Sequence, residues 1–503
     1  MILGINSFTH DSSIALIKKN EPIILLEEER ISRIKHHDGF IFGGTPPYNS
    51  LRLINKRYNY SKIAHSYDVN FSASNTNLPQ LNFLNFAKSL DPKLKRTYFF
   101  NHHMCHAASA YYCSNYTSAY IITLDSKGDG LSLSISIGKG NNIDKIFELP
   151  SRTSICSIYS YISEVLRLGK RNEGSLMALA SFGKQRLVSD IFAWSGFGIN
   201  INKVQLVSLA KKAKKFGDMS NIAFTIQESF ESIILDIIRD ICIDKDIKLL
   251  CLAGGGFLNC SLNKKIIESK RWESIYIPPC SGDSGTALGA ALLCLDNPSE
   301  FDIKHAYWGT RYSKNYIKIL LEKFKLKYQE TDSNLLAKLI ADGNIVAVFN
   351  GAMEFGPRAL GNRSLIADPR KLSSKNKLNQ IKKRRQWRPI APIVLDEFGN
   401  DWFENYRYTP FMTQAFNIKE DKINKIPAIR HADNSARLQS VTQENKFLYD
   451  LTFAFFKLTG VPLLCNTSYN INSPIVQSPA DALSIFFTSS IDYLYIEGFL
   501  VIK

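Results

Sequence analysis

Residues 2–28 read ILGINSFTHDSSIALIKKNEPIILLEE, and residues 120–149 read YIITLDSKGDGLSLSISIGKGNNIDKIFEL. In each stretch, runs of apolar and β-branched residues alternate with short turns of small and polar residues, which predicts three strands joined by hairpins. The first turn of each stretch contains aspartate together with glycine or serine. We therefore expect a duplicated core in which these two first turns are directed at the same ligand.

Two later segments extend this plan. Residues 249–266, LLCLAGGGFLNCSLNKKI, predict a buried strand, a triple glycine and a helix, and residues 275–293 predict a strand, a Gly/Asp/Ser turn and a helix of small residues. The amphipathic stretch 155–245 is expected to be helical and to connect the halves. Such a duplication is the architecture of actin-like phosphotransferases, and it predicts an α/β fold.

The pattern restarts after residue 300. A helix is expected near 332–342, followed by the strand NIVAVFN and a polar loop, GAMEFGPRALGNRS. A chain of 503 residues is long for one hydrophobic core. We therefore expect separate domains, divided near 305–315 and written here as residues 1–308 and 309–503.

Bulk composition excludes several classes of protein. The chain is 45% hydrophobic and 21% charged, as in folded proteins, and its nine cysteines include no CxxC pair. Reduced thiols in the cytoplasm fit best. The N-terminus does not resemble a secretory signal, and no run approaches the roughly 18 apolar residues that suggest a membrane span. The net charge of +16 raises the question of nucleic acid, but the basic residues are mostly dispersed and no nucleic-acid-binding module is visible.

Residues 101–110, NHHMCHAASA, contain three histidines. On a helix, His102 and His106 share one face, a common arrangement for metal chelation, although helical histidines often only pack. Asp125 and Asp283 lie in turns that the duplicated plan directs to the same cleft. This set suits Fe(II), Mn or Zn better than calcium. His103 points elsewhere, and Cys105 is expected to face the core.

Two other features of the first half can be interpreted either as parts of a functional site or as ordinary turns. The triple glycine Gly254–Gly256 allows close backbone approach and predicts a phosphate cradle, although glycine runs also form ordinary turns. Asn259 and Asn263 are expected on one face of the following helix, within reach of the same ligand. His10 lies in a polar turn, where it is either a general base or an ordinary turn histidine.

The second half is rich in fixed positive charge. The loop EFGPRALGNRS contains Glu354, Arg358 and Arg363, and IKKRRQWRP contains Lys382, Arg384 and Arg388, which alternate as on a strand that presents one face. Arg437 follows in HADNSARLQ, and Ser468 and Asn470 follow in NTSYN. Arginine forks match phosphate and carboxylate oxygens. Their convergence predicts an anion site, against the alternative of exposed salt bridges.

Taken together, these motifs resemble the O-carbamoyltransferases of the nodulation, cephem-antibiotic and aminoglycoside type over nearly the whole chain. The segments that carry the resemblance are THDSSIAL, EEERISRIKH, NHHMCHAASA, GGGFLNC, SGDSGTALGAAL, EFGPRALGNRSLIADPR, WRPIAP and TGVPLLCNTSYN. The resemblance implies a Kae1-like N-terminal domain of the actin-like superfamily and a YrdC-like C-terminal domain. The second is expected to make carbamoyl adenylate from carbamoyl phosphate and Mg-ATP, and the first to transfer the carbamoyl group to a hydroxylated small molecule or saccharide.

The resemblance also implies roles for individual residues. The implied metal ligands are His102, His106, Asp125 and Asp283, and the implied catalytic residues are His10 and Lys35. The implied nucleotide and carbamoyl-adenylate contacts are Gly128, Gly254, Gly255, Gly256 and Asn259. In the second domain, the implied ligands of carbamoyl phosphate and ATP are Glu354, Arg358, Arg363, Lys382, Arg384, Arg388, Arg437, Ser468 and Asn470.

Some positions depart from the family pattern. Ser126 and Lys127 follow the metal-binding aspartate where glycine is usual, Asn434 and Ser435 replace Gly-Thr, and Ala178 replaces a glycine near the expected adenosine pocket. The first pair affects the expected binding of the acceptor, whose identity the sequence leaves open.

An alternative function is carbamoylation of an amine or threonylcarbamoyl transfer to tRNA, which the net charge favours. A nucleic-acid partner is otherwise disfavoured, and a homodimer is allowed.

Overall fold

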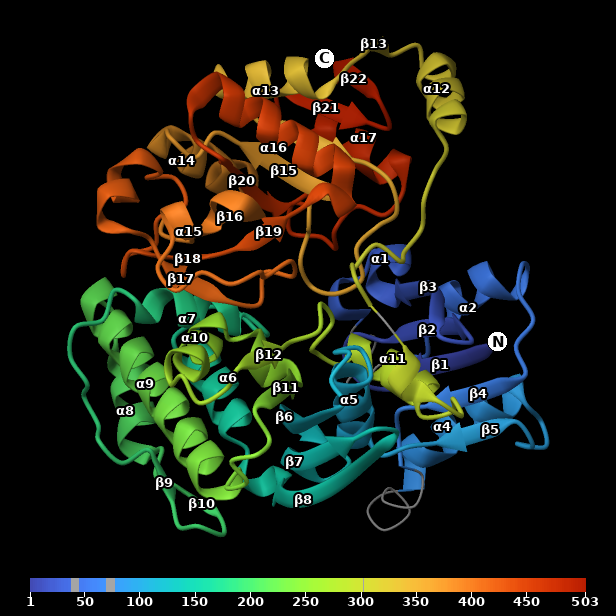
Figure 1. Ribbon diagram of the computed structural model, residues 1–503, viewed down its shortest axis with the longest axis vertical. Helices are drawn as coiled ribbons and strands as arrows, with labels where there is room; N and C mark the ends of the chain where they lie inside the picture. Colours follow the sequence, from blue (N-terminus) through green and yellow to red (C-terminus); the bar gives the residue numbers. More distant parts are fainter. Residues whose placement is uncertain (38–44, 69–76, 302) are drawn as a thin grey trace. The chain divides into compact units, whose positions relative to one another are not determined.

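The computed structural model of the protein describes residues 1–37, 45–68, 77–301 and 303–503 (Figure 1). These residues divide into two compact units, Met1–Glu28 with His36–Lys304 and Glu29–Lys35 with His305–Lys503. The division in the chain thus falls between Lys304 and His305, where the sequence places it between 308 and 309. The assignment of Glu29–Lys35 to the second unit was not predicted.

Two five-stranded sheets with the same plan form the first unit. The order is β3-β2-β1-β4-β5 in one sheet and β8-β7-β6-β11-β12 in the other (Figure 1). In both, three antiparallel strands are followed by two parallel ones. The first sheet consists of β1 (Ile2–Asn6), β2 (Ser13–Lys18), β3 (Glu21–Glu27), β4 (Lys62–His65) and β5 (Thr97–Phe99). The second consists of β6 (Ser118–Gly128), β7 (Leu131–Lys139), β8 (Asn142–Pro150), β11 (Leu249–Ala253) and β12 (Ser274–Tyr276). The predicted hairpins and the duplicated plan of the first domain are confirmed.

Helices of the first unit include the predicted helical stretch. The helices and small elements are α1 (Glu28–Ser32, shared with the second unit), η1 (Lys35–His37), α2 (Tyr48–Asn55), α4 (Asn77–Leu90), α5 (His102–Tyr111), η2 (Ser151–Thr153), α6 (Ile155–Val165), α7 (Glu173–Ala180), the hairpin β9 (Phe192–Trp194) and β10 (Ile199–Ile201), α8 (Val204–Lys212), α9 (Phe216–Ile241), η3 (Gly255–Leu258), α10 (Cys260–Glu268), α11 (Ser284–Leu292) and η4 (Pro298–Glu300). All nine cysteines of the chain are buried free thiols. Among the described residues, no helix combines the length and apolarity needed to cross a bilayer.

Small residues bring α11 against both β1 and α5. A Cβ atom on Gly4 would lie 1.8 Å from the carbonyl oxygen of Ala287, and one on Gly289 would lie 1.8 Å from that of Cys105. Both distances are far below van der Waals contact, so only glycine fits. Because α5 and α11 lead directly into the candidate site, this close packing fixes two of its walls.

The second unit is a mixed α/β layer. Its eight-stranded sheet has the order β13-β22-β21-β14-β15-β20-β16-β19, in which β14 with β21 and β16 with β19 are parallel pairs. The strands are β13 (Lys327–Glu330), β14 (Val346–Phe349), β15 (Arg363–Ala367), β16 (Ala391–Leu395), β19 (Gln439–Val441), β20 (Leu463–Ser468), β21 (Tyr493–Ile496) and β22 (Phe499–Ile502). The remaining elements are α12 (Lys314–Lys323), α13 (Ser333–Ala341), α14 (Leu372–Ile381), η5 (Asp396–Phe398), α15 (Gly399–Trp402), β17 (Ala415–Asn417), η6 (Glu420–Lys425), β18 (Ser435–Arg437), η7 (Gln443–Asn445), α16 (Lys446–Thr459) and α17 (Pro479–Phe487). A continuous apolar core lies between the sheet and these helices. The predicted two-domain α/β fold is confirmed.

Replacing Gly289 by alanine tests the contact between α5 and α11. The added methyl group has no space beside Cys105, so we expect the free energy of unfolding to fall by about 1–3 kcal/mol, as for other overpacked cores. Gly217→Ala is the matched control, because it lies in helix α9 and a Cβ atom added there would have no neighbour within 4 Å. Denaturant unfolding of both variants measures the difference, and equal stabilities would contradict this account.

Candidate metal centre and anion site

Helix α5 places two histidines on one buried face. The side chain of Asn101 caps the helix by accepting hydrogen bonds from the backbone N–H groups of His103 (3.0 Å) and Met104 (3.2 Å). The helix therefore begins at His102, and the four-residue spacing turns His102 and His106 to the same side. Their Nε2 atoms lie 3.0 Å apart, and both side chains are buried.

Two aspartates reach the same point from other elements. Asp125 lies in β6 where its pairing with β7 is interrupted between Leu124 and Gly128, and its Oδ2 atom is 3.2 Å from His106 Nε2. Asp283 precedes α11 without capping it, and its Oδ1 atom lies 3.6 Å from the Nε2 atoms of both histidines. One ligand atom from each of the four buried side chains lies within 4.8 Å of the other three.

This geometry fits a divalent transition metal. Nitrogen and oxygen ligands about 2.1 Å from an ion are roughly 3.0–3.6 Å apart when they subtend about 90–120°. The observed separations of 3.0, 3.2 and 3.6 Å fall in that interval. Asp283 Oδ1 is also buried without a hydrogen-bond partner among the described residues, as expected of a ligand atom. The four residues expected from the sequence can therefore hold the ion together.

The charges of this group are strongly coupled. Burial disfavours the charged form of His102, yet the neighbouring carboxylates of Asp283 and Asp125 raise its pKa well above the usual value. Burial likewise opposes ionisation of Asp283, but His10 and His102 hold its pKa well below the usual value. The two buried carboxylates therefore require positive charge beside them, which protons or a metal ion supply.

His103 lies outside the metal group. Its Nδ1 atom is 2.6 Å from Thr123 Oγ1, which in turn lies 2.7 Å from Ser134 Oγ. Burial lowers the pKa of His103 to about 3, with His102 and His106 adding to the effect, so this imidazole is neutral. It joins α5 to the sheet through a chain of hydroxyl groups.

Glycines around the metal group have direct packing reasons. A Cβ atom on Gly128 would lie 2.1 Å from the ring of His102, and one on Gly254, whose φ is +95°, would lie 2.2 Å from the carbonyl oxygen of Leu124. Gly256 lies against the Leu124 side chain, whereas a Cβ atom on Gly255 would be 3.3 Å from Asp125 Oδ1. These residues press the backbone against the end of β6. Their expected contacts with a nucleotide stay a prediction.

The two asparagines after the triple glycine are placed differently from expectation. Asn259 precedes α10 and caps it by accepting from the N–H of Leu262 at 3.1 Å, while its amide pairs with that of Gln227. Asn263 is inside the helix and donates back to the carbonyl of Phe257 at 2.8 Å. They therefore do not form one helical face, because the chain turns once more before the helix begins. Gln227, which anchors Asn259, was not identified from the sequence.

His10 lies close to the metal group. Its Nε2 atom is 3.8 Å from Asp283 Oδ2, and its Nδ1 atom is 2.9 Å from Asp11 Oδ2. The other oxygen of Asp11 is 2.9 Å from His36 Nδ1, so Asp11 orients two imidazoles. Burial would lower the pKa of His10, but Asp283 and Asp11 raise it to about 10. Asp11 and His36 were missed as site residues, although both adjoin residues that the sequence singled out.

In the second unit, the predicted strand through Lys382, Arg384 and Arg388 is wrong. Helix α14 continues to Ile381, Lys382 caps it, and the chain turns at Lys383, whose φ is +49°. The turn nevertheless brings Lys382 to the end of β20, where its ammonium donates to the carbonyl (2.6 Å) and hydroxyl (2.9 Å) of Ser468 and to Asn470. The predicted Lys382, Ser468 and Asn470 therefore form one group.

Several cations gather around this lysine. Burial lowers the pKa of Arg384 to about 9, with Arg388 and Arg437 contributing, and lowers that of Arg388 to about 10, with Arg437 contributing. Burial, Arg384 and Lys35 depress the pKa of Lys382 well below its usual value. Mutual depression of this kind shows that the cations lie close together, which favours an anion as the ligand. Lys35 belongs to the second unit and lies near Lys382, whereas the sequence grouped it with His10.

Glu354 and Arg363 form the internal frame of their loop. Glu354 Oε1 accepts from the backbone N–H groups of Leu360 and Asn362, both at 2.8 Å, and from that of Arg363 at 3.1 Å. The Arg363 guanidinium is fully buried 3.6 Å from the centre of the Phe349 ring and donates to four carbonyl groups. Both residues therefore shape the loop, while Arg358 is only half buried.

Comparing His106→Ala with His103→Ala tests the proposed metal centre. We expect the first variant to lose nearly all bound metal, because it removes a ligand, and the second to keep it, because His103 lies outside the metal group and its Nδ1 atom pairs with Thr123. Metal content after dialysis, measured by mass spectrometry, gives the result, with circular dichroism as the folding control. Loss of metal in His103→Ala alone would contradict the assignment.

Comparison with known proteins gives the family. The model of the carbamoyltransferase N-terminus matches residues 1–44 and 48–292, and that of the carbamoyltransferase C-terminus matches residues 337–503. Nodulation protein NolNO of Sinorhizobium fredii is 31% identical over 99% of this chain and 80% of its own length. Nodulation protein NolO of Bradyrhizobium diazoefficiens is 33% identical over 80% of this chain and 79% of its own.

Similarity to solved structures is weaker. HypF of T. kodakarensis aligns with 58% of this chain and 46% of its own at 13% identity and a TM-score of 0.38, which is too low to carry an argument. The family models span both units and include the metal group and the basic group described above. The chain therefore belongs to the carbamoyltransferase family and is an enzyme that transfers carbamoyl groups.

Proposed function

We propose that the protein is an ATP-dependent O-carbamoyltransferase that makes carbamoyl adenylate in its second unit and consumes it in its first. The observation that carries this proposal is the presence of two different sites, one in each unit. One is a buried His/Asp group beside His10, and the other is a cluster of cations around Lys382. Membership in the carbamoyltransferase family gives the group that is transferred.

The first step takes place at the basic group. Carbamoyl phosphate, ATP and water give carbamoyl adenylate, phosphate and pyrophosphate, and every phosphate-bearing species in this step is anionic. Lys382, Arg384, Arg388 and Arg437 neutralise these charges and stabilise the charge that develops at the attacked phosphorus. Burial and the neighbouring cations depress the pKa of Lys382, and a bound anion would offset both effects. Ser468 and Asn470 hold the lysine in place.

In the second step, an acceptor hydroxyl attacks the carbamoyl carbon of the adenylate. The new C–O bond joins the acceptor, the bond to the phosphate oxygen breaks, and AMP leaves. His10 is held by Asp11, which also pairs with His36, and in its neutral form would take the hydroxyl proton. The carboxylate of Asp283 raises the pKa of His10, and positive charge bound beside that carboxylate would lower the pKa again and give the neutral imidazole. A divalent cation held by His102, His106, Asp125 and Asp283, with Fe(II), Mn or Zn as candidates, would polarise the phosphate of the adenylate as a Lewis acid.

A saccharide hydroxyl is our proposed acceptor class. The support is similarity to proteins named for nodulation, together with open polar positions next to the metal group. Ser126 and Lys127 follow Asp125 directly, and Lys127 is exposed. Ser126 occupies the position where the family usually has glycine and Lys127 is beside it, so these two residues are the first candidates for acceptor specificity.

Replacing His10 by asparagine separates the two steps. We expect pyrophosphate release from ATP and carbamoyl phosphate to stay near the wild-type rate, while carbamoyl transfer falls at least ~100-fold, as is typical when a general base is removed. Mass spectrometry of a panel of saccharides and tRNA, searching for a gain of one carbamoyl group, measures the transfer. Equal loss of both steps would remove His10 from the proposed role.

The matched variant Lys382→Met should give the opposite result. Without its ammonium group the second unit cannot neutralise carbamoyl phosphate, so pyrophosphate release should stop and transfer should stop with it.

With the wild-type enzyme, carbamoyl product on tRNA but on no saccharide would overturn the proposed acceptor class.

A further inference from the structure

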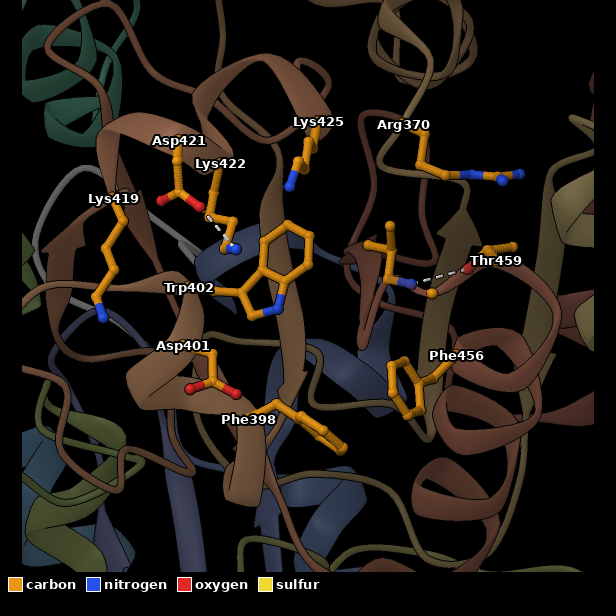
Figure 2. Close-up of a pocket in the computed structure, with 12 residues that line it drawn as sticks. Arg370, Phe398, Asp401, Trp402, Lys419, Asp421, Lys422, Lys425, Phe456 and Thr459 are labelled. Atoms are coloured by element: carbon orange, nitrogen blue, oxygen red, sulfur yellow. Dashed lines mark hydrogen bonds and ion pairs between the residues drawn. The ribbon is translucent and has the colours of Figure 1, made fainter.

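A hollow with a volume of about 780 Å³ lies on the second unit, away from the residues assigned above (Figure 2). It is bordered by η5, α15, η6 and the C-terminal end of α16. The aromatic rings of Trp402, Phe398 and Phe456 form its apolar part. Figure 2 shows Lys422 and Lys425 near the Trp402 ring, with Lys419 farther from the ring on the side of Lys422.

The local sequence explains why three lysines meet here. They stand at positions 419, 422 and 425, at the start of η6 and within it. In a 3₁₀ helix, side chains three residues apart eclipse one another, so Lys422 and Lys425 share one face of η6, and Lys419, the residue before this helix, borders the same hollow. The Lys422 ammonium also lies 5.5 Å from the centre of the Trp402 ring. The three lysines therefore form a group of cations beside an aromatic surface.

Nearby carboxylates do not neutralise all the positive charge of these lysines. Arg370 is paired with the buried Asp368 at 2.8 Å, and Lys422 is paired with Asp421 at 2.7 Å. Lys419 and Lys425 form no salt bridge with any residue that the structure describes, and Asp401 is the one other carboxylate among the residues that border the hollow. The terminal carbonyls of α16 are partly satisfied, because Gly460 N–H donates to Phe456 and the Thr459 hydroxyl donates to Phe455. The hollow therefore keeps excess positive charge.

Strand register separates this hollow from the Lys382 group. Strands β15 and β20 pair antiparallel, with Ser364 opposite Ser468 and Ala367 opposite Cys465. Ser468 contacts Lys382 at one end of β20, whereas Val461, just before its other end, borders the hollow. The six residues of β20 span roughly 17 Å at about 3.3 Å per residue. The two basic regions thus lie at opposite ends of the same strand pair and cannot share a small ligand.

We propose that this hollow is a second binding site of the second unit, for an organic anion that combines a phosphate group with a planar ring. Lys419 and Lys425 pair with the phosphate, as lysines do in acting as point charges. The ring of the ligand packs against Phe398, Phe456 and the edge of Trp402. The site is independent of carbamoyl transfer, so its test needs no activity measurement.

Phenyl phosphate is the probe, because it carries only these two features. Titration calorimetry should show binding to the wild-type chain that weakens when the salt concentration rises from about 50 to about 500 mM, since exposed charges are screened. The charge-reversal variant Lys419→Glu/Lys425→Glu should bind at least tenfold more weakly. Lys323→Glu/Lys327→Glu is the matched control, because it makes the same change in net charge at exposed lysines of α12 and β13.

Lys382→Ala distinguishes the hollow from the proposed catalytic group. Binding of phenyl phosphate should persist in this variant and be at least tenfold weaker in the Lys419/Lys425 variant. Loss of binding in Lys382→Ala alone would assign the probe to the catalytic group and overturn the proposal. Absence of binding to the wild-type chain at millimolar probe, or equal binding to all four proteins, would overturn it as well.

Discussion

The first unit buries the carboxylates of Asp125 and Asp283 beside His102 and His106. These carboxylates require positive charge close to them. Removing a carboxylate from water carries a penalty of several kcal/mol even after relaxation, and only nearby positive charge recovers it. The low pKa of Asp283 and the high pKa of His102 are two expressions of this requirement. A group that must hold positive charge, and whose four ligand atoms converge within 4.8 Å, is preorganised for a divalent ion.

The rest of the first unit serves this convergence. Each of the two repeated sheets supplies one turn, with His10 and Asp11 from the first and Asp125 from the second. Helices α5 and α11 supply the other three ligands, and the absence of side chains at Gly289 and Gly128 lets α5 approach α11 and lets the His102 ring fit against β6. The glycines, which contribute no chemical group, therefore decide where the ligands lie.

The sequence predicted the parts of the fold that depend on local pattern. The hairpins of both repeats follow from alternating apolar runs and turn residues, and the pairing of His102 with His106 follows from helical spacing. Residues whose role depends on long-range contacts could not be placed. Asn259 became a helix cap because of where α10 begins, and the alternation read through Lys382 and Arg384 was a helix end followed by a turn.

Charged residues in loops were the hardest to interpret. Glu354 and Arg363 satisfy backbone groups of their own loop, whereas Arg384 donates to Asn379 and Pro389 and also lies near the cations of Arg388 and Arg437. Nothing in the residue types separates these cases, because a guanidinium can satisfy carbonyl oxygens or phosphate oxygens equally well. Only the folded positions decide which charges are already compensated.

Segment Glu29–Lys35 limits how the gene could be divided between the two units. It follows β3 of the first unit, yet Arg33 donates to the carbonyls of Pro474 (2.8 Å) and Ile475 (2.6 Å), and Arg30 donates to that of Gly356 (2.9 Å). A gene cut between Lys304 and His305 would leave these seven residues on the wrong fragment. The units are thus not interchangeable modules joined by a linker, and fission of the gene into two proteins would require a new way to fill that place in the second one.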